Sequence, residues 1–348
     1  MIRMKKMKLD KNLKSSLITY GMVVVFYIVM QSLVMTGNIS SLMKGLLVPL
    51  CIYSIMAVSL NLTVGILGEL SLGHAGFMCI GAFAGAFFSK CMNGAMPDLL
   101  RFVCAILIGI PVLRLKGDYL AIVTLGFGEI IKNLVNVFYV GRDSEGFHFS
   151  MKDAMSLNML EDGEVIIKGA QGITKTPQDS NFTIGVILLL IALVIVLNFV
   201  NSRSGRAVMA IRDNRIAAES VGINITKYKL MAFSISAALA GVAGVLYAHN
   251  LTTLTALPKN FGYNQSIMIL IFVVLGGIGN IRGSVIGAVV LTVLPELMRS
   301  LQDYRMLIYA VVLIGVMLFT WAPKAKELRE KYSLKRLLGA KLAKKGDQ

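Results

Sequence analysis

Long, uninterrupted runs of apolar residues restrict the possible folds of this chain more than any other feature. The run FTIGVILLLIALVIVLNFV, residues 182–200, contains no charged residue and is long enough to cross ~30 Å of hydrocarbon as a helix. A soluble domain of 348 residues that is 56% hydrophobic and 16% charged could not keep so much apolar surface out of water. The chain is therefore predicted to be an all-α polytopic membrane protein.

The apolar runs predict about ten transmembrane helices. Their ranges are 16–36, 45–64, 72–89, 99–113, 119–140, 182–200, 229–249, 264–280, 284–298 and 304–321. The run at 99–113 is the weakest, because about fifteen residues at ~1.5 Å per residue cover only ~22 Å. The first run follows a basic segment and resembles a signal peptide, but it is too long for one, so we expect a retained span.

Basic residues are distributed unequally between the two sides of this topology. With the N-terminus inside, the inner segments carry 24 of the 35 Lys and Arg residues, and the outer segments carry ten. The bias follows the positive-inside rule and predicts that both termini are cytoplasmic. It also accounts for the net charge of +16, so we predict contact with a lipid bilayer and not with nucleic acid.

The predicted topology divides the chain into a basic cytoplasmic N-terminus, 1–15, a transmembrane domain, 16–321, and a basic cytoplasmic tail, 322–348. The outer loop 141–181 carries seven acidic and four basic residues, and a loop of that length usually has a function. The inner loop 201–228 is predicted to contain a short amphipathic helix, with Val208, Ile211, Ala217 and Val221 apolar between arginines. The tail is either an interfacial helix on anionic lipid or a disordered segment.

Two glycine-rich segments interrupt the apolar runs. They are GILGELSLGHAG, residues 65–76, and GGIGNIRGSVIG, residues 276–287. They lie near the starts of two groups of spans, 45–140 and 229–321. The starts of the two groups are five spans apart, and an odd offset reverses the direction in which a helix crosses the membrane. Any repeat would therefore be an inverted one. Interrupted helices at matching places in two halves indicate the substrate pathway of a transporter, although ordinary helix packing through small residues explains the glycines equally well.

Glu129 and Lys132 are ionisable residues within a predicted span, at i and i+3. A lone charge at the bilayer centre costs about 2.5–3.5 kcal/mol on insertion scales, so each side chain is expected to face protein or water and to have a partner. Glu before Lys is the favourable order for a helical pair. The two residues form either a structural ion pair or part of the lining of a pathway.

Motifs for catalysis and for metal binding are absent from the sequence. The chain contains no GxxxxGK[ST] phosphate-binding loop, no HExxH, no CxxC and no GxSxG, and its three histidines are far apart. Four cysteines lie in or beside apolar runs and are expected to be packing residues. We therefore predict no enzymatic activity, cofactor or metal, and any ATP that drives transport must be hydrolysed by a partner subunit.

Several stretches of the sequence resemble the permeases of branched-chain amino acid ABC transporters, and most closely the M-type subunits of the LIV system. The signature stretches are NLTVGILGELSLGHAGFMCIGAF (61–83) and PVLRLKGDYLAIVTLGFGEIIKN (111–133). GAQGITKTP (169–177), NSRSGRAVMAIRDNRIAAESVGIN (201–224) and LGGIGNIRGSVIGAVVL (275–291) resemble further family segments. In one departure, the segment 96–113 is about a dozen residues shorter than the span that the family has there.

This resemblance implies a fold similar to that of type II ABC importer permeases, with an inverted repeat of spans two to five and seven to ten. It implies import of leucine, isoleucine and valine. It also implies an H-type permease subunit, two cytoplasmic ABC ATPase subunits and an extracytoplasmic binding protein as partners. The alternatives are an ABC permease for urea, short amides or another small polar solute, and a secondary amino acid transporter, which would need ion-coupling carboxylates in mid-span.

The resemblance and the glycine breaks together give two sets of candidate site residues. The candidate substrate pathway consists of Asn61, Thr63, Gly65, Gly68, Ser71, His74, Thr124, Glu129, Gly276 and Gly277. The candidate ATPase-coupling residues are Arg206, Arg212, Arg215, Ala218, Glu219 and Gly222. In the second set Gly222 is suited to a helix end that requires a positive φ.

Overall fold

The computed structural model describes residues 2–37, 39–92, 97–108, 120–161, 163–297, 310–311 and 314–315. The contacts divide the chain into two compact units, Met1–Thr292 and Val293–Gln348. The fold below is that of the first unit. The tail 322–348, most of the predicted span 304–321 and the C-terminal end of the predicted span 99–113 lie outside the described residues.

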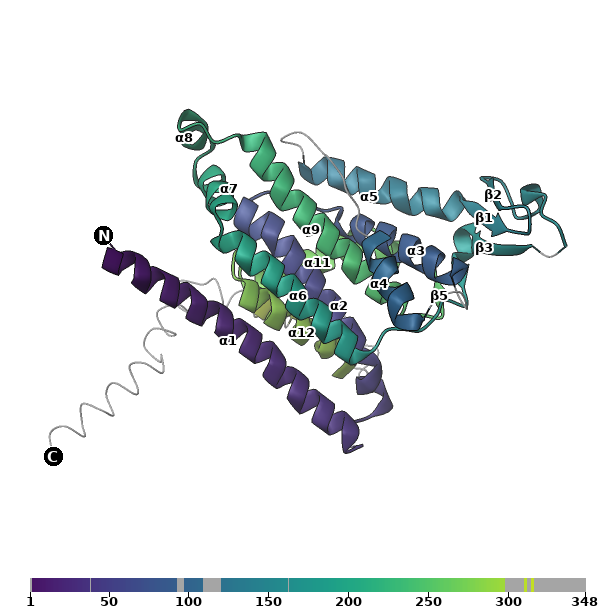
Figure 1. Cartoon of the computed structure of the whole chain (residues 1–348), viewed down its shortest axis with the longest axis horizontal. Helices are drawn as coiled ribbons and strands as arrows, with labels where there is room; N and C mark the ends of the chain where they lie inside the picture. Colours follow the sequence, from purple (N-terminus) through teal and green to yellow (C-terminus); the bar gives the residue numbers. More distant parts are fainter. Residues whose placement is uncertain are drawn as a thin grey trace. The chain divides into compact units, whose positions relative to one another are not determined.

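The described part of the chain is mostly helical, which confirms the predicted class at that level (Figure 1). The α-helices are α1 (Ile2–Met35), α2 (Ser41–Asn61), α3 (His74–Cys91), α4 (Asp98–Ile108), α5 (Leu120–Val137), α6 (Phe182–Asn201), α7 (Arg203–Asp213), α8 (Arg215–Ser220), α9 (Ile225–Ala248), α10 (Pro258–Phe261), α11 (Tyr263–Gly276) and α12 (Ile281–Leu297). A π-helix, η1 (Leu62–Leu67), extends α2, and η2 (Met155–Leu157) and η3 (Gly169–Gln171) are 3₁₀ turns.

Four helices in the described ranges are long and apolar enough to cross a membrane: Ser16–Met35, Ser41–Leu67, Phe182–Asn201 and Ile225–Ala248. They coincide with four of the predicted spans. Helices α3, α5, α11 and α12 lie at four further predicted spans.

The core of the bundle is built around α9, which packs along α3 and α2, and α2 also packs against α6 (Figure 1). Small residues bring the backbones together. A Cβ atom on Gly81 would overlap the backbone of Gly241, and one on Gly244 would overlap the carbonyl oxygen of Met78. Such contacts are typical of membrane helices, where close packing replaces the hydrophobic drive between helices.

The short helix α4 is held in place by a charged contact and a ring contact. The buried Arg101 guanidinium donates to Asp179 Oδ2 at 2.6 Å and lies 3.0 Å from Asp98 Oδ1. The Phe102 ring meets the His249 ring edge-on, with centroids 5.0 Å apart. At ~1.5 Å per residue the eleven residues of α4 cover only ~16 Å, so this described segment does not cross a bilayer by itself.

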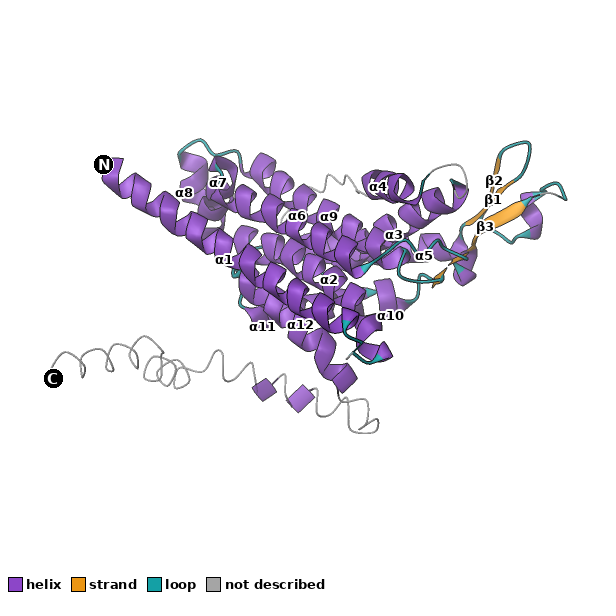
Figure 2. Ribbon diagram, turned by 60° about the horizontal axis from the view of Figure 1, so that its bottom comes forward, coloured by secondary structure: helices purple, strands orange, loops and turns teal. Residues whose placement is uncertain are grey.

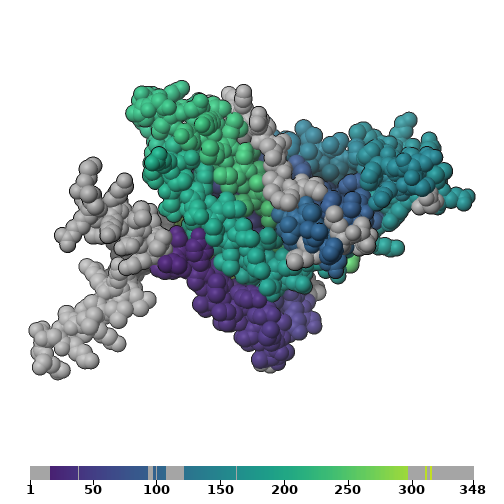
Figure 3. Space-filling view, in the orientation of Figure 1, coloured from purple at the N-terminus to yellow at the C-terminus, as the bar shows by residue number. Residues whose placement is uncertain are grey.

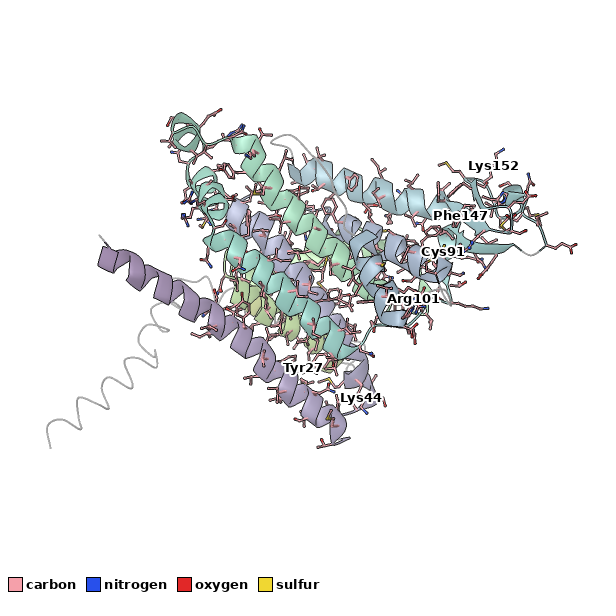
Figure 4. The ribbon with its side chains drawn as sticks, in the orientation of Figure 1. Tyr27, Lys44, Cys91, Arg101, Phe147 and Lys152 are labelled. Atoms are coloured by element: carbon pink, nitrogen blue, oxygen red, sulfur yellow. The ribbon has the colours of Figure 1, made fainter. Side chains whose placement is uncertain are left out.

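Helix α1 lies along the edge of the bundle beside α6 (Figure 3). Tyr27, labelled in Figure 4, contacts the start of α6: its hydroxyl is 3.1 Å from Thr183 Oγ1, and its ring centroid is 5.4 Å from that of Phe182. Only 11% of the apolar window of α1 is buried within the chain, compared with 89% for α2 and η1. Most of the apolar surface of α1 is therefore left for lipid or another protein.

The segment between α5 and α6 contains strands, which the all-α prediction did not include (Figure 2). Strands β1 (Tyr139–Arg142), β2 (Phe147–Ser150) and β3 (Glu164–Lys168) form an antiparallel sheet in the order β2-β1-β3. β4 (Ile173–Thr174) pairs with β5 (Thr253–Leu254). Strands this short carry almost no periodic pattern, and β5 is more than seventy residues from its partner along the chain.

Asp143 closes the turn between β1 and β2. Its Oδ1 accepts from the amides of Glu145 at 2.9 Å and Gly146 at 3.0 Å, and its Oδ2 accepts from Leu160 N at 3.2 Å and lies 2.9 Å from His148 Nε2. Burial raises the pKa of Asp143, but these hydrogen bonds outweigh burial and hold the pKa below its usual value. The carboxylate therefore remains ionised at neutral pH and keeps the loop folded back on itself.

Candidate functional site

The first glycine-rich segment is a true interruption of the helix. Helix α2 changes into the π-helix η1 at Leu62, and η1 ends at Gly68 with φ +82°, a left-handed value that favours glycine. The chain is then non-helical until α3 begins at His74. A π-helical turn inside an α-helix often marks a functional site, because it widens the helix and leaves carbonyl groups for other partners.

The second glycine-rich segment is interrupted in a similar way. Helix α11 ends at Gly276, Gly277 and Gly279 have φ values of +96° and +81°, and α12 begins at Ile281. A Cβ atom on Gly276 would overlap the backbone of Gly283, so α11 and α12 pack tightly just beside the turn.

The two interruptions touch each other in the folded chain. Asn61, the last residue of α2, accepts from Gly279 N at 2.9 Å through Oδ1 and donates to Ser284 Oγ at 2.8 Å through Nδ2. Gly65 packs directly on Gly279, where a Cβ atom would overlap the backbone. The two segments, which were predicted only to occupy matching places in two halves of the chain, are therefore in direct contact.

Hydrogen bonds between buried polar side chains continue from this contact into the bundle. Thr63 Oγ1 donates to Ser236 Oγ at 2.9 Å, and Ser236 Oγ donates to the Ser59 carbonyl at 2.5 Å. Ser59 Oγ lies 2.7 Å from His74 Nε2. These side chains are completely buried, so each hydrogen bond holds polar groups that would otherwise be costly in an apolar interior. We call Ser59, Asn61, Thr63, His74, Ser236 and Ser284 the polar layer.

The start of α3 adjoins the polar layer. Thr124 Oγ1 accepts from Leu72 N at 3.3 Å, and Ser266 Oγ accepts from Ala75 N at 3.0 Å. A Cβ atom on Gly73 would overlap the Thr124 carbonyl, so α5 approaches this turn very closely. The fully buried Ser71 Oγ has no hydrogen-bond partner in the described part of the chain.

Glu129 lies apart from these contacts. Its carboxylate forms an ion pair with Lys132, as the spacing predicted, and Oε1 also accepts from Tyr263 N at 3.1 Å at the start of α11. Lys132 is nearly buried. Both features favour the structural ion pair over the lining of a pathway.

The inner loop forms two helices instead of the single amphipathic helix predicted. Asn214 is extended, with φ −156° and ψ 106°, and its side chain accepts from Ala217 N at 3.0 Å, so that it caps a new helix, α8. Val208 and Ile211 are buried as predicted, but Val221 is 75% exposed. After the break at Asn214, Ala218 of α8 still packs against Ile211 of α7, and the chain that follows α8 is exposed at Val221.

The predicted coupling residues lie in different environments. Ala218 is buried with Ile211 and Ile225, and Gly222 has φ +82° and ends α8 by donating to the Glu219 carbonyl at 2.9 Å, as predicted. Arg215 and the Glu219 side chain are on exposed positions of α8.

The arginines of α7 bind backbone carbonyl groups. Arg206 Nη1 donates to the Asn201 carbonyl at 3.0 Å, within its own segment. Arg212 Nη1 donates instead to the Gly65 carbonyl in η1 at 2.8 Å, and its side chain covers Gly68. Helix α7 is thus bonded directly to the π-helix.

Several residues in these contacts were not among the predictions. Glu69, in the first glycine-rich segment, pairs with Lys229 at the start of α9. Ser59, Ser236, Ser266 and Ser284 were also missed. Serines inside otherwise apolar spans were the available signal, although a serine there can equally bond its own helix.

A large apolar groove lies elsewhere in the first unit. It has about 590 Å³ of open space and is lined mainly by aliphatic side chains of α1, α2, α6 and α12, among them Val23, Cys51, Val186 and Val285. None of the polar-layer side chains lines it, so it is unsuited to a zwitterion. Within the described residues no three His, Cys, Asp or Glu side chains are grouped as metal ligands would be.

Comparison with known proteins now gives these contacts a context. Residues 42–320 match the family model described as "Branched-chain amino acid transport system / permease component". The chain belongs to this family. The permease family resemblance is thereby confirmed over most of the sequence, both breaks and the coupling segment included.

Three similar members of the permease family are themselves subunits of one kind of transport system. The chain is 35% identical to the high-affinity branched-chain amino acid transport system permease protein LivM of Salmonella typhimurium, over 78% of this chain and 67% of the relative. LivM of Escherichia coli is 34% identical over the same shares. LivH of Salmonella typhimurium is 24% identical over 76% of this chain and 88% of the relative. No solved structure gives a significant match to the chain.

Proposed function

We propose that this chain is the membrane-spanning subunit of an ATP-driven importer that moves leucine, isoleucine and valine into the cell. The similarity to LivM, which covers 78% of the chain, carries the proposal. The pathway lies along the polar layer and the two glycine breaks, since these are the places where helices of the bundle are interrupted and polar groups are buried.

The proposed architecture is about ten spans in a bacterial inner membrane, with an inverted repeat as in type II importers. Two interrupted helices that meet through Gly65 and Gly279 support this arrangement. The α7–α8 segment and the β1–β3 sheet lie at opposite ends of the long helices in both ribbon views (Figures 1 and 2), which supports an inner and an outer side. The segments 1–15 and 322–348 are proposed to be cytoplasmic.

The α7–α8 segment is the proposed docking site for one of two cytoplasmic ATPase subunits. Ile216 and Val221 are 81% and 75% exposed, in a stretch whose other exposed side chains include both basic and acidic residues. Exposed apolar residues at the centre of a polar rim are typical of a protein interface. The similarity to both LivM and LivH supports pairing with an H-type permease subunit.

The sheet region is the proposed docking surface for an extracytoplasmic binding protein. Phe149, Met151 and Met155 are exposed on it, and Met155 is 91% exposed. Acidic residues lie among them and give the loop 141–181 its negative balance. A binding protein that fits this surface would present a basic or polar surface with an apolar centre.

Reconstitution tests the proposal directly. The chain is assembled in proteoliposomes with the H-type subunit, both ATPases and the binding protein encoded with it, and uptake of labelled leucine is measured. We expect uptake that requires ATP, and isoleucine and valine in excess should compete while urea and acetamide should not. Uptake that persists without ATP, or competition by urea alone, would contradict the proposal.

A further inference from the structure

The hydrogen bonds of His74 determine which of its ring nitrogens carries a proton. The Ser59 hydroxyl donates its single hydrogen to the Met56 carbonyl at 2.9 Å. Ser59 Oγ must therefore act as the acceptor in its 2.7 Å contact with His74 Nε2, and Nε2 carries the hydrogen. In the neutral imidazole the other nitrogen, Nδ1, is then a bare acceptor.

Neither Nδ1 of His74 nor Oγ of Ser71 has a hydrogen-bond partner in the described part of the chain, although both residues are completely buried. Buried polar atoms in native proteins are rarely left in this state, and each exception calls for a reason. His249 offers a contrast: its Nδ1 lies 2.9 Å from the Val245 carbonyl and its Nε2 lies 2.8 Å from Ser89 Oγ, so both nitrogens are satisfied.

His74 is the first residue of α3, an eighteen-residue helix, and Ser71 lies three residues before it. The N-terminus of a helix carries partial positive charge and favours a carboxylate. An acceptor nitrogen needs a donor, and a hydroxyl can donate to an anion. The head group of an α-amino acid has an ammonium donor and a carboxylate acceptor on a single carbon, so it meets both needs at once.

Aromatic side chains adjoin this position. The Phe77 ring meets the His74 ring edge-on with centroids 6.0 Å apart, and Phe127 and Phe233 lie 5.7 and 5.4 Å from Phe77. A branched aliphatic side chain can pack against such rings. Charged side chains are not part of these contacts, so binding is expected to be weak and transient, as suits a pathway.

We propose that His74 and Ser71 receive the head group of the transported amino acid: His74 Nδ1 accepts from the ammonium group, and the Ser71 hydroxyl donates to the carboxylate. This inference rests on the proposed function and adds to it the residues that contact the substrate. Without substrate the two groups have no partner among the described residues. An amino acid that pairs with both of them stabilises the open conformation in which it can bind.

Two substitutions at His74 separate this role from a structural one. His74→Asn keeps an acceptor oxygen near the position of Nδ1 but loses the Ser59 contact, while His74→Gln keeps an amide nitrogen near Nε2 that can still donate to Ser59 and loses the Nδ1 acceptor. We expect leucine uptake by the assembled transporter to fall about tenfold in His74→Gln, equivalent to about 1.4 kcal/mol, and to be largely retained in His74→Asn. The reverse order, or equal uptake by both variants, would overturn the proposal. His249→Gln is the matched control and should not change uptake.

A spectroscopic readout does not depend on turnover. The chain has three histidines, so ¹⁵N-histidine labelling of the assembled transporter in nanodiscs resolves the Nδ1 resonance of His74. Leucine should shift this resonance, and 4-methylpentanoate, which lacks the ammonium group, should not. A resonance unmoved by leucine would reject the inference. Failure of wild-type uptake would instead reject the proposed function, so the two failures are distinguishable.

Discussion

Gly65 shows how a single residue can connect the two halves of the bundle. Its carbonyl binds Arg212, its backbone contacts Gly279, and its missing side chain leaves space for Asn61 Oδ1. No side chain fits at position 65, because besides Asn61 Oδ1 a Cβ atom would overlap the backbone N and Cα of Gly279, which cannot rotate away. Its neighbour Gly68 is needed for a different reason, since its φ of +82° is costly for any residue with a Cβ atom.

Gly65→Ala is therefore expected to destabilise the permease by about 1–3 kcal/mol, the usual cost of overpacking a close contact. Gly45→Ala is the matched control, because Gly45 lies earlier in α2 with open space around it. The Gly45→Ala substitution should leave stability unchanged or raise it slightly through helix propensity. The midpoint of thermal unfolding in detergent is measured for both variants. Equal midpoints would contradict the prediction, because they would show that the Gly65–Gly279 contact can adjust to an added methyl group.

Among the helices, α7 is distinguished by a hydrogen bond from one of its side chains to the backbone of the π-helix η1. The π-helical turn leaves the Gly65 carbonyl available, and the Arg212 guanidinium binds it. A displacement of α7 by an ATPase is therefore transmitted to η1 through one charge-assisted hydrogen bond and the packing of Arg212 on Gly68. Arg206, on the same helix, instead donates to the Asn201 carbonyl at the adjoining end of α6.

Arg212→Gln should lower leucine uptake per ATP hydrolysed by about tenfold, because a hydrogen bond from a charged group is worth about 1.5–3 kcal/mol. ATPase subunits should still assemble with this variant. Arg206→Gln provides the comparison: we expect it to weaken assembly with the ATPases and to leave the ratio of uptake to hydrolysis unchanged. The two ratios are measured side by side in proteoliposomes, and a normal ratio for Arg212→Gln would contradict the link.

At the scale of the whole molecule, the inner and outer ends of the bundle carry different surfaces. The α7–α8 end exposes Ile216 among basic residues, and the sheet end exposes Met155 among acidic ones. The excess of Lys and Arg in the predicted inner segments predicts that the first end is cytoplasmic.

Cysteine labelling tests this orientation. In a background where Cys51, Cys79, Cys91 and Cys104 are replaced by alanine, Met155→Cys and Ile216→Cys each present one exposed thiol. A membrane-impermeant maleimide should label Met155→Cys in intact spheroplasts, and Ile216→Cys only after permeabilisation. Labelling of both thiols from the same side would refute the predicted topology.

The local features of the bundle could be predicted from the sequence. Runs of apolar residues predict spans at 16–36, 45–64, 182–200 and 229–249, and the four long apolar helices overlap these ranges. Glycine clusters predict the interruptions. Both kinds of feature depend on residues close together in the chain. The positive φ of Gly222 and the ion pair of Glu129 with Lys132 belong to the same local category.

Long-range contacts could not be predicted in this way. Asn61 and Gly279 are more than two hundred residues apart, and Arg212 reaches Gly65 only because α7 packs against η1. The break at Asn214 depends on a cap that competes with a continuous helix, and the short strands depend on partners elsewhere in the chain. Apolar length and glycine act locally, so a helical membrane protein with two glycine-rich interruptions follows from the order of residues alone. That the two interruptions meet depends on the packing of distant helices, because hydrogen bonds between buried polar groups form where packing brings donors and acceptors together.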